Sequence, residues 1–235
     1  MKWKVGFFLL FLFACSEGYD NSDLSIFKYN ESNGISTLDP AFAKDKATIW
    51  ATSQIFSQLV SMDNNLEVIP DVAKKWIVSE DGLTYSFYLR DDVFFHDHKS
   101  FNGGKGRKVI ASDFQYSFDR LTDEKIASPG SWVLNNVKNY SAKNDSTFII
   151  ELNSPFPPFL SLLSMQYCSV LPKEVAENLS FRSDPIGSGP FKFQFWKEGV
   201  KLVLRKNENY FEFEEESRLP YLDAIAVTFI KDKQS

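Results

Sequence analysis

A strict alternation of apolar and polar positions between residues 83 and 90 is the feature that most constrains the fold. Leu83, Tyr85, Phe87 and Leu89 occupy every second position, and Thr, Ser, Tyr and Arg fill the positions between and after them. Successive side chains of a β-strand point to opposite faces, so this pattern predicts a strand with one buried face. The preceding Glu-Asp-Gly ends in a turn signal, which places a hairpin bend before the strand.

Other segments are predicted from the same kinds of pattern. Strands are expected at 76–78, 147–152, 200–204 and 224–230, helices at 47–61, 112–121 and 159–165, and a solvated acidic loop at 208–216. Ser112 begins the second helix, because Gln115 follows three residues later as in a capping box, and Phe114, Phe118 and Leu121 then share one face. Because strands and helices are mixed without regular alternation, the fold class is α+β or irregular α/β.

Charge and cysteine content exclude several functional classes. The 235 residues suit one to two domains, and 26 basic against 31 acidic residues give a net charge of -5. A nucleic-acid-binding protein normally has a basic excess, so no nucleic-acid partner is expected. Two cysteines are too few for a disulfide scaffold or a Cys-rich zinc site. Cys168 lies in an apolar stretch and is predicted to be buried and inert.

The N-terminus has the pattern of an export signal. Lys2 and Lys4 precede the apolar run Val5–Phe13, which is too short to cross a hydrocarbon core of about 30 Å. The run ends in Leu-Phe-Ala-Cys, which resembles a bacterial lipoprotein signal, although Phe13 is bulkier than is usual there. We therefore expect residues 1–14 to be removed, Cys15 to be lipidated, and residues 15–24 to tether the fold to a membrane; a plain signal peptide is the alternative.

No constellation of residues predicts an active site. His96 and His98 flank Asp97, but no other histidine could complete a tetrahedral metal site, so a surface loop is expected there. The Gly-rich stretch 103–108 lacks the spacing of a phosphate-binding loop. Ser188 lies between two glycines, yet the sequence has no nucleophile elbow and no suitably placed base. The sequence therefore predicts a protein that is not an enzyme and has no metal or cofactor.

Several phrases, in order and spacing, resemble the family-5 extracellular solute-binding proteins, which are the oligopeptide and dipeptide receptors of ABC importers. The sequence departs from the family pattern by an insertion at 102–108 and by His98, where glycine is usual. The phrases are, in chain order, Ser36–Phe42 (STLDPAF), Asp71–Trp76 (DVAKKW), Ser79–Tyr85 (SEDGLTY), Leu89–Arg90, Phe95–Asp97, Ala111–Phe114, Tyr116–Leu121, Pro185–Phe191 (PIGSGPF) and Asn207–Tyr210 (NENY).

The resemblance implies a periplasmic binding protein type II-like fold, in which two lobes close on a ligand by a hinge and an extra small domain is inserted. It implies a first lobe from residues 25–56 and 183–235, and a small domain from 57–182. The second ligand-binding lobe is expected to follow residue 235. On this interpretation the sequence is the N-terminal portion of a longer lipoprotein, and alone it is expected to bind peptide weakly or not at all.

The resemblance also implies a function. The protein would capture peptides outside the cytoplasmic membrane, as a lipid-anchored monomer, and deliver them to permease and ATPase subunits. The ligand-binding residues implied on the present lobe are Thr37, Leu38, Asp39, Pro40, Gly187, Ser188 and Gly189. The alternatives are a receptor of the same family for nickel, a haem-like ligand or an oligosaccharide, and a surface lipoprotein without a transport role.

Overall fold

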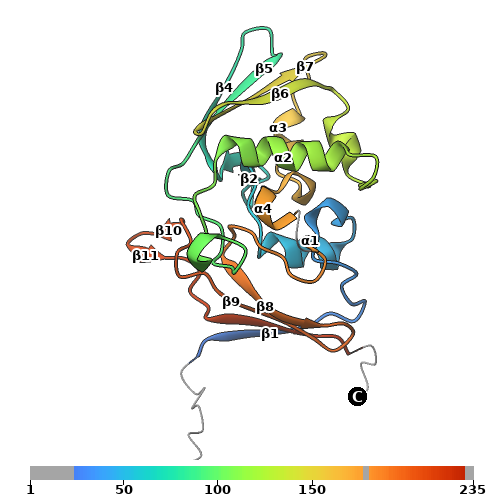
Figure 1. The fold of residues 1–235 in the computed structure, drawn as a ribbon, viewed down its shortest axis with the longest axis vertical. Helices are drawn as coiled ribbons and strands as arrows, with labels where there is room; N and C mark the ends of the chain where they lie inside the picture. The colour runs from blue at the N-terminus through green and yellow to red at the C-terminus, as the bar shows by residue number, and fades with distance from the viewer. Residues whose placement is uncertain (1–23, 177–179, 231–235) are drawn as a thin grey trace, which may run out of the picture.

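Two four-stranded sheets lie at opposite ends of the molecule, with short helices between them (Figure 1). The computed structural model describes residues 24–176 and 180–230. The upper sheet has the order β4-β5-β7-β6 and the lower sheet has the order β1-β12-β9-β8. The strands of the upper sheet are β4 (Ala73–Val78), β5 (Thr84–Leu89), β6 (Val137–Asn144) and β7 (Thr147–Leu152), and those of the lower sheet are β1 (Ile26–Asn30), β8 (Phe191–Lys197), β9 (Lys201–Lys206) and β12 (Ala224–Thr228).

The upper sheet confirms the strand predicted from alternation. In β5 the side chains of Tyr85, Phe87 and Leu89 are buried, whereas the positions between them are half-buried. All pairings in this sheet are antiparallel, and each strand pairs with at least one strand that is close to it in the sequence. The predicted strand at 147–152 is β7, with the bounds that the sequence indicated.

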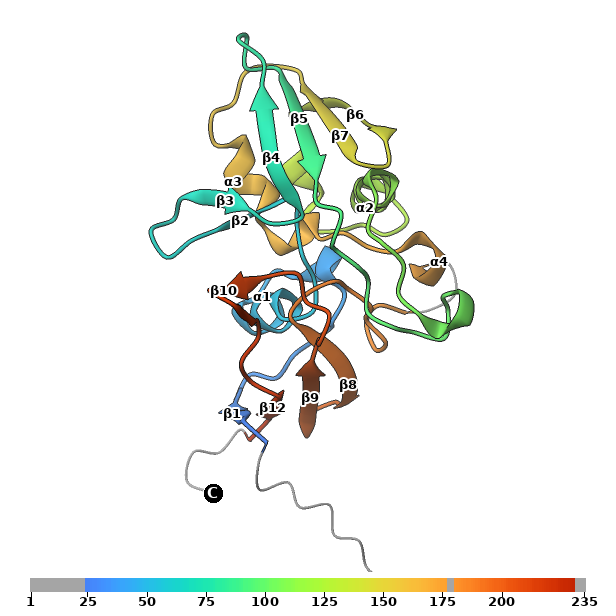
Figure 2. The same ribbon diagram turned by 90° about the vertical axis from the view of Figure 1, so that its left-hand side faces the viewer.

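Helix α2 (Ala111–Thr122) covers one face of the upper sheet, as Figures 1 and 2 show. The predicted apolar face is confirmed, because Phe114, Phe118 and Leu121 are all buried. The ring of Phe148 on β7 lies edge-on to Phe118, with centroids 5.5 Å apart. Edge-to-face ring pairs of this kind add to the stabilisation from apolar burial.

The predicted cap of α2 is wrong. The helix begins at Ala111, so Ser112 lies inside its first turn. The capping carboxylate is Asp113, whose Oδ2 accepts a hydrogen bond of 2.9 Å from the backbone N–H of Ile110. Arg107 binds both oxygens of the same carboxylate at 2.8 and 2.6 Å. Asp113, the third residue of the helix, therefore makes the bond back to the N-cap N–H that a capping box begun by Ser112 would have given to Gln115.

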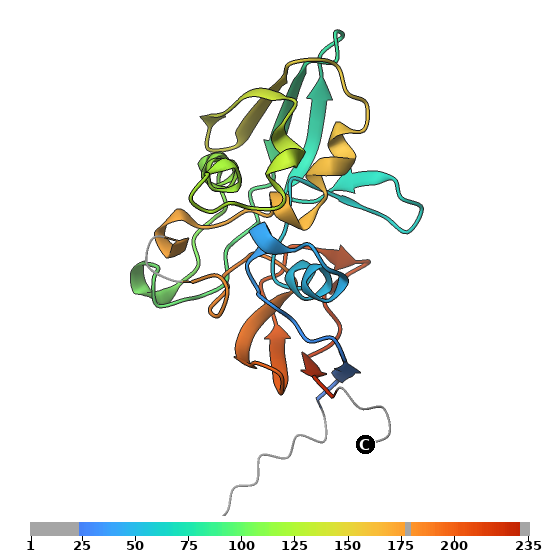
Figure 3. The same ribbon diagram turned by 90° about the vertical axis from the view of Figure 1, so that its right-hand side faces the viewer.

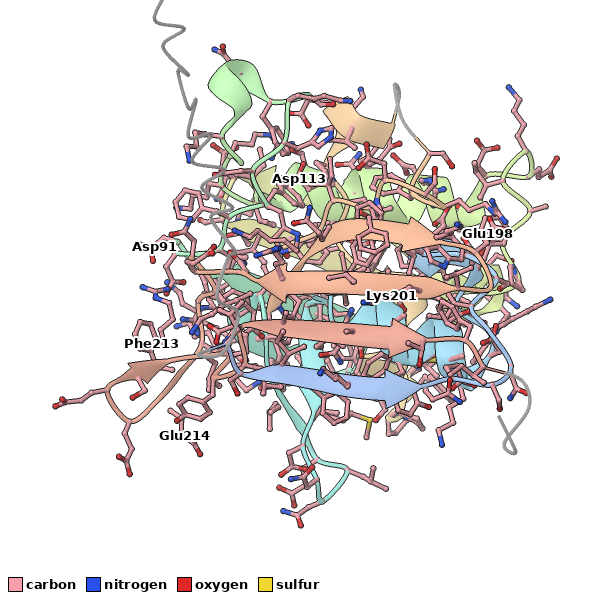
Figure 4. All side chains as sticks on the ribbon, turned by 90° about the horizontal axis from the view of Figure 1, so that it is seen from below. Asp91, Asp113, Glu198, Lys201, Phe213 and Glu214 are labelled. Carbon is pink, nitrogen blue, oxygen red and sulfur yellow. The ribbon has the colours of Figure 1, made fainter. Side chains whose placement is uncertain are left out.

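The lower sheet joins the two ends of the described chain. Strand β1 pairs in parallel with β12, in a register that places Phe27 opposite Ile225 and Tyr29 opposite Val227. Figure 4 shows this sheet from below, with β1 in blue at one edge, and the described helices lie behind it. Parallel pairing needs a long crossover, and here the crossover contains the whole upper part of the molecule.

The first predicted helix is shorter than expected. Helix α1 (Lys46–Ser53) begins at the cap Asp45, whose Oδ1 accepts from the N–H of Thr48 at 2.9 Å, and it ends eight residues before the predicted Ser61. Beyond it, the carbonyl oxygens of Gln54 and Ile55 accept hydrogen bonds from Phe191 and Gly189. Pairing with a distant segment replaces the pairing that would have continued the helix. The apolar spacing at 55–59 reflects burial without helical structure.

Short elements complete the fold and adjust the remaining predictions. Tyr210 and Phe211 are buried, so the predicted solvated loop at 208–216 is wrong for those two residues. The predicted helix at 159–165 ends two residues early. The short elements are η1 (Pro40–Phe42), β2 (Val60–Met62), β3 (Val68–Pro70), η2 (Asn102–Gly104), η3 (Ser131–Leu134), α3 (Phe159–Leu163), η4 (Gln166–Cys168), α4 (Lys173–Ala176), β10 (Phe213–Glu214) and β11 (Ser217–Arg218).

One apolar cluster runs through both sheets. It includes Phe87 and Phe148 of the upper sheet and Leu202 and Val227 of the lower sheet. Cys168 belongs to it, and burial raises the pKa of its thiol to about 12, which confirms the predicted buried position. Because the cluster is continuous, the division into 25–56 with 183–235 and 57–182 stays a prediction.

No helix among the described residues is long and apolar enough to cross a membrane. The predicted signal segment 1–14, Cys15 and all but the last residue of the tether 15–24 lie outside the described residues.

Candidate functional site: a joint around α1

The segment Thr37–Pro40 follows β1 and is buried along its whole length. The Thr37 hydroxyl accepts a hydrogen bond of 3.0 Å from the N–H of Asp39, and the Asp39 carboxylate accepts one from the N–H of Ala41. These local bonds fold the chain into η1, with Pro40 at its first position, where no N–H is needed. The side chains of this segment therefore point into the protein.

Asp39 is also half of a buried ion pair. Its two oxygens accept hydrogen bonds from both terminal nitrogens of Arg120, at 3.1 and 2.5 Å, and each side chain is about one-tenth exposed. The Arg120 guanidinium also stacks on Phe181. Since Arg120 belongs to α2, this pair ties the loop after β1 to the layer that covers the upper sheet. Asp39 and Arg120 line one end of a surface cavity of about 670 Å³.

Gly187 and Gly189 pack against protein backbone. A Cβ at Gly187 would lie 2.1 Å from the carbonyl oxygen of Ile55, and one at Gly189 would lie 2.6 Å from the carbonyl carbon. The N–H of Gly189 donates to that same oxygen at 2.8 Å. Glycine is required because no side chain fits between the two chains. Ser188 between them is buried, and its hydroxyl has no hydrogen-bond partner among the described residues.

His96 is buried against the same glycines, so the predicted surface loop is wrong at this residue. Its N–H donates to Gly187 O at 2.8 Å, and its Nε2 donates to Gly189 O at 2.9 Å. Burial lowers the pKa of His96 to about 4, and the ring is therefore neutral. Asn207 donates a third hydrogen bond to this region, at Gly189 O. Among the described residues, no group of three or more side chains could bind a metal.

Helix α1 lies between the two sheets (Figure 3), and contacts next to the two predicted segments reach its two ends. Ser36 is within hydrogen-bond distance of Thr48 in the first turn, and Gly187 and Gly189 contact Ile55 just after the last turn. These contacts hold α1 between the two sheets. We call the segments 36–40 and 187–189, together with the side chains that contact them, the joint. A shallow cavity of about 310 Å³ borders its first end, lined by Glu31, Ser36, Asp45, Lys46 and their neighbours.

Sequence reasoning missed the partners in the joint. Arg120 lies within one of the quoted phrases, so a charge-pairing argument with Asp39 could have found it. Ser128, whose hydroxyl donates to Ala41 O at 2.5 Å, has no such signal. Asn207 also lies within a quoted phrase, but nothing in the sequence indicates its bond to Gly189. That the seven predicted residues bind a peptide stays a prediction, because the structure describes only their contacts within the protein.

Comparison with known proteins identifies the family. Residues 67–235 match the sequence profile of the bacterial extracellular solute-binding proteins, family 5, middle region. The chain belongs to this family. The chain is 30% identical over 200 residues to the dipeptide-binding protein of Escherichia coli strain K12, which covers 76% of this chain and 36% of that protein. It is 28% identical over 232 residues to the haem-binding protein A of Haemophilus influenzae, covering 90% and 41%.

Solved structures of family-5 proteins have the same fold. The DppA binding protein of Helicobacter pylori, in complex with the peptide STSA, superposes with a TM-score of 0.78 and 31% identity, covering 89% of this chain and 43% of that one. NikZ of Campylobacter jejuni, in complex with Ni(L-His), has a TM-score of 0.73 and 30% identity, covering 90% and 40%.

The chain thus spans about two-fifths of the length of the relatives it matches. These relatives are two-lobed binding proteins, not enzymes, and the mixed α/β architecture described here corresponds to a part of that fold. The family's members act as extracellular or periplasmic solute-binding proteins.

Proposed function

We propose that the protein is the substrate-binding component of a peptide ABC importer. It captures peptides outside the cytoplasmic membrane and delivers them to permease and ATPase subunits, as a monomer held to the membrane by a lipid on Cys15. The observation that carries the proposal is the likeness to the Helicobacter pylori protein with a bound peptide, at 31% identity over 89% of this chain. The Escherichia coli dipeptide-binding relative supports the same cargo class.

We further propose that the joint acts on the ligand by positioning backbone. The side chains of Thr37–Pro40 are buried, and Gly187 and Gly189 are closed off by Ile55, so direct side-chain contact with a peptide is disfavoured. A rigid joint holds the adjoining edge of the first lobe in a fixed geometry. An extended peptide can pair with main-chain groups there, which gives affinity with little side-chain selectivity.

A facing second lobe is part of this proposal. The relatives have two lobes, and this chain spans about two-fifths of their length. Since a ligand gains affinity from burial on both sides, the described part alone should bind peptide weakly. Closure of the second lobe over the first would then enclose the peptide.

Peptide uptake by the producing bacterium tests the proposal without assuming how much of the protein is required for binding. Deleting the gene should lower uptake of isotope-labelled tri-alanine several-fold, leave uptake of free alanine unchanged, and be reversed by a plasmid copy. Unchanged uptake across a panel of di- to pentapeptides would contradict the proposal. Loss of nickel or haem uptake instead would assign the protein to the cargo class of NikZ or of the haem-binding relative.

A further inference from the structure

A cavity of about 410 Å³ opens between the end of α1, the β2–β3 hairpin and the chain that follows β9. Its lining shares no residue with the seven predicted ligand-binding positions. Phe56 and Met62 contribute apolar surface, and Ser57, Asp71 and Glu212 contribute oxygen atoms. The cavity therefore combines a negative, oxygen-rich part with an apolar part.

Asp71 is the most deeply placed charge in this cavity. Its residue is 6% exposed, and its Oδ2 accepts a hydrogen bond of 2.7 Å from the N–H of Gln58. Among the described residues, Oδ1 of Asp71 makes no hydrogen bond. This oxygen is not fully shielded from solvent. Asp71 is one of the residues that line the cavity.

Ser57 has the same property. The residue is 3% exposed, its backbone carbonyl accepts from Val170, and its hydroxyl has no partner among the described residues. This hydroxyl is likewise not fully shielded from solvent. Two nearly buried side chains that line one cavity thus carry oxygens without a hydrogen-bond partner among the described residues. A ligand that carries several N–H donors could pair with both oxygens at once.

The charges around the cavity favour a cation. Glu212 lies on its wall, and the Asp71 and Glu212 carboxylates both help burial to raise the pKa of Tyr210. Arg90 is the nearby cation, but its guanidinium is held by Asp92 at 2.9 and 2.8 Å and by the carbonyl oxygen of Phe211. Since Arg90 is already paired, the two carboxylates are not fully compensated from within the protein.

We propose that this cavity binds a primary alkylammonium group. The three N–H donors of an ammonium match the Asp71 Oδ1, the Ser57 hydroxyl and the Glu212 carboxylate. The methylene groups next to the ammonium would pack on Phe56 and Met62. The group could belong to a free alkylamine or to a lysine side chain, which share this chemistry. The proposal concerns a site apart from the joint and does not rest on the peptide-import proposal.

Binding should depend on pH in a defined direction. The pKa of Asp71 is raised to about 7, mainly by burial and in smaller part by Glu212, against the opposing effects of the Gln58 N–H and Arg90; the neighbouring Tyr210 phenol stays neutral. An ammonium binds the ionised carboxylate, so affinity should increase as pH rises through 7. Between pH 6 and pH 8 the ionised fraction changes about tenfold, which sets the size of the expected change in affinity.

Calorimetric titration of the purified protein with n-butylammonium chloride tests the site. We expect saturable binding at pH 8 and binding several-fold weaker at pH 6, whereas butan-1-ol, which has the same stem without charge, should not bind. Nα-acetyl-lysine N-methylamide is the second probe. Binding of both probes would show that the site accepts a lysine side chain as well as a free alkylamine. Binding of butylammonium alone would restrict the site to free amines. No binding of butylammonium at pH 8 would overturn the proposal.

Matched variants assign the binding to these residues. Asp71→Asn should abolish butylammonium binding and its pH dependence, while the amide oxygen can still accept from Gln58. Glu212→Gln leaves the buried Asp71 carboxylate in place and should weaken binding several-fold. Asp91→Asn removes an exposed carboxylate outside the cavity and should leave binding unchanged. Circular dichroism checks each fold, and equal binding by the wild type and either cavity variant would contradict the assignment.

Discussion

The two sheets of this protein differ in how far apart in the sequence their paired strands lie, although both contain antiparallel neighbours such as β4–β5 and β8–β9. The upper sheet pairs β4 with β5 and β6 with β7, which are neighbours in the chain, and every pairing is antiparallel. The lower sheet pairs β1 with β12, whose residues are about 200 positions apart. Periodicity finds strands in both sheets, but it carries no information on which distant strand completes the lower one.

The joint connects the upper sheet to the lower sheet. The Asp39–Arg120 pair connects the loop after β1 to α2, and His96 connects the chain after β5 to Gly187 and Gly189 before β8. A continuous apolar cluster underlies both connections. We infer that the two sheets open and unfold together.

The largest contrast between the sheets is expected from truncating an aromatic side chain in each. Phe148→Ala removes a fully buried ring from the upper sheet and should lower the free energy of unfolding by about 3–5 kcal/mol. Phe27→Ala, at the edge strand β1, removes a ring that is 45% exposed and should cost less than about 1 kcal/mol. Urea denaturation measures both, and equal losses would show that the edge of the lower sheet is packed as tightly as the upper core.

Breaking the ion pair of the joint should have the next largest effect. Arg120→Ala leaves the Asp39 carboxylate buried without its partner, so we expect a loss of about 2–4 kcal/mol. The control is Glu198→Ala, which breaks the Arg182–Glu198 pair, whose side chains are 53% and 60% exposed. That change should cost about 0–1 kcal/mol. Thermal unfolding of the two variants compares them, and a small loss for Arg120→Ala would remove the pair from the account of the joint.

The close approach at Gly189 predicts a moderate effect. Gly189→Ala places a Cβ 2.6 Å from the Ile55 carbonyl carbon, and the shift of one chain that this requires should cost about 1–3 kcal/mol. Ser188→Ala removes only a hydroxyl without a described partner, so its stability should be nearly that of the wild type. Comparing the denaturant midpoints of the two variants shows whether stability is lost through the close contact at Gly189 or through any substitution in this segment.

The last contrast is a pH dependence with opposite signs at two buried groups. The pKa of His96 is lowered to about 4 in the folded protein, against 6.5 for a free histidine, so its contribution to stability is lost as pH falls from 6.5 to 4. The pKa of Asp71 is raised to about 7, so its contribution is lost as pH rises from 4 to 7. His96→Gln should flatten the acid limb of the stability profile, and Asp71→Asn should flatten the neutral limb. Stability measured from pH 4 to 8 checks both signs.

The fold was more predictable than the joint, for physical reasons. The alternation at β5 and the apolar face of α2 follow from burial on one side, which a sequence records directly. The end of α1 did not follow from its spacing, because hydrogen bonds from Gly189 and Phe191 to residues 54 and 55 replace the next helical turn. The cap of α2 was misplaced by two residues because Asp113, paired with Arg107, binds the N–H of Ile110 and so fixes the start of the helix at Ala111.

The candidate site was predictable in position but not in role. The resemblance selected Asp39 and the two glycines, and all three prove to be structural contacts of the joint. A glycine that admits a ligand and a glycine that admits another part of the chain look alike in a sequence, and only the position of Ile55 distinguishes them. His96 was placed on the surface because nothing near it in the sequence shows that Gly187 and Gly189 cover it.

Native-state amide hydrogen exchange tests most directly whether the joint unites the two sheets. The account predicts that the slowest amides of β7 and β12 exchange with the same opening free energy in the wild type, because both require global unfolding. In Arg120→Ala the two values should separate, with β12 exchanging faster than β7. Unequal opening free energies in the wild type, or values that stay equal in Arg120→Ala while both fall, would contradict the claim that this joint couples the sheets.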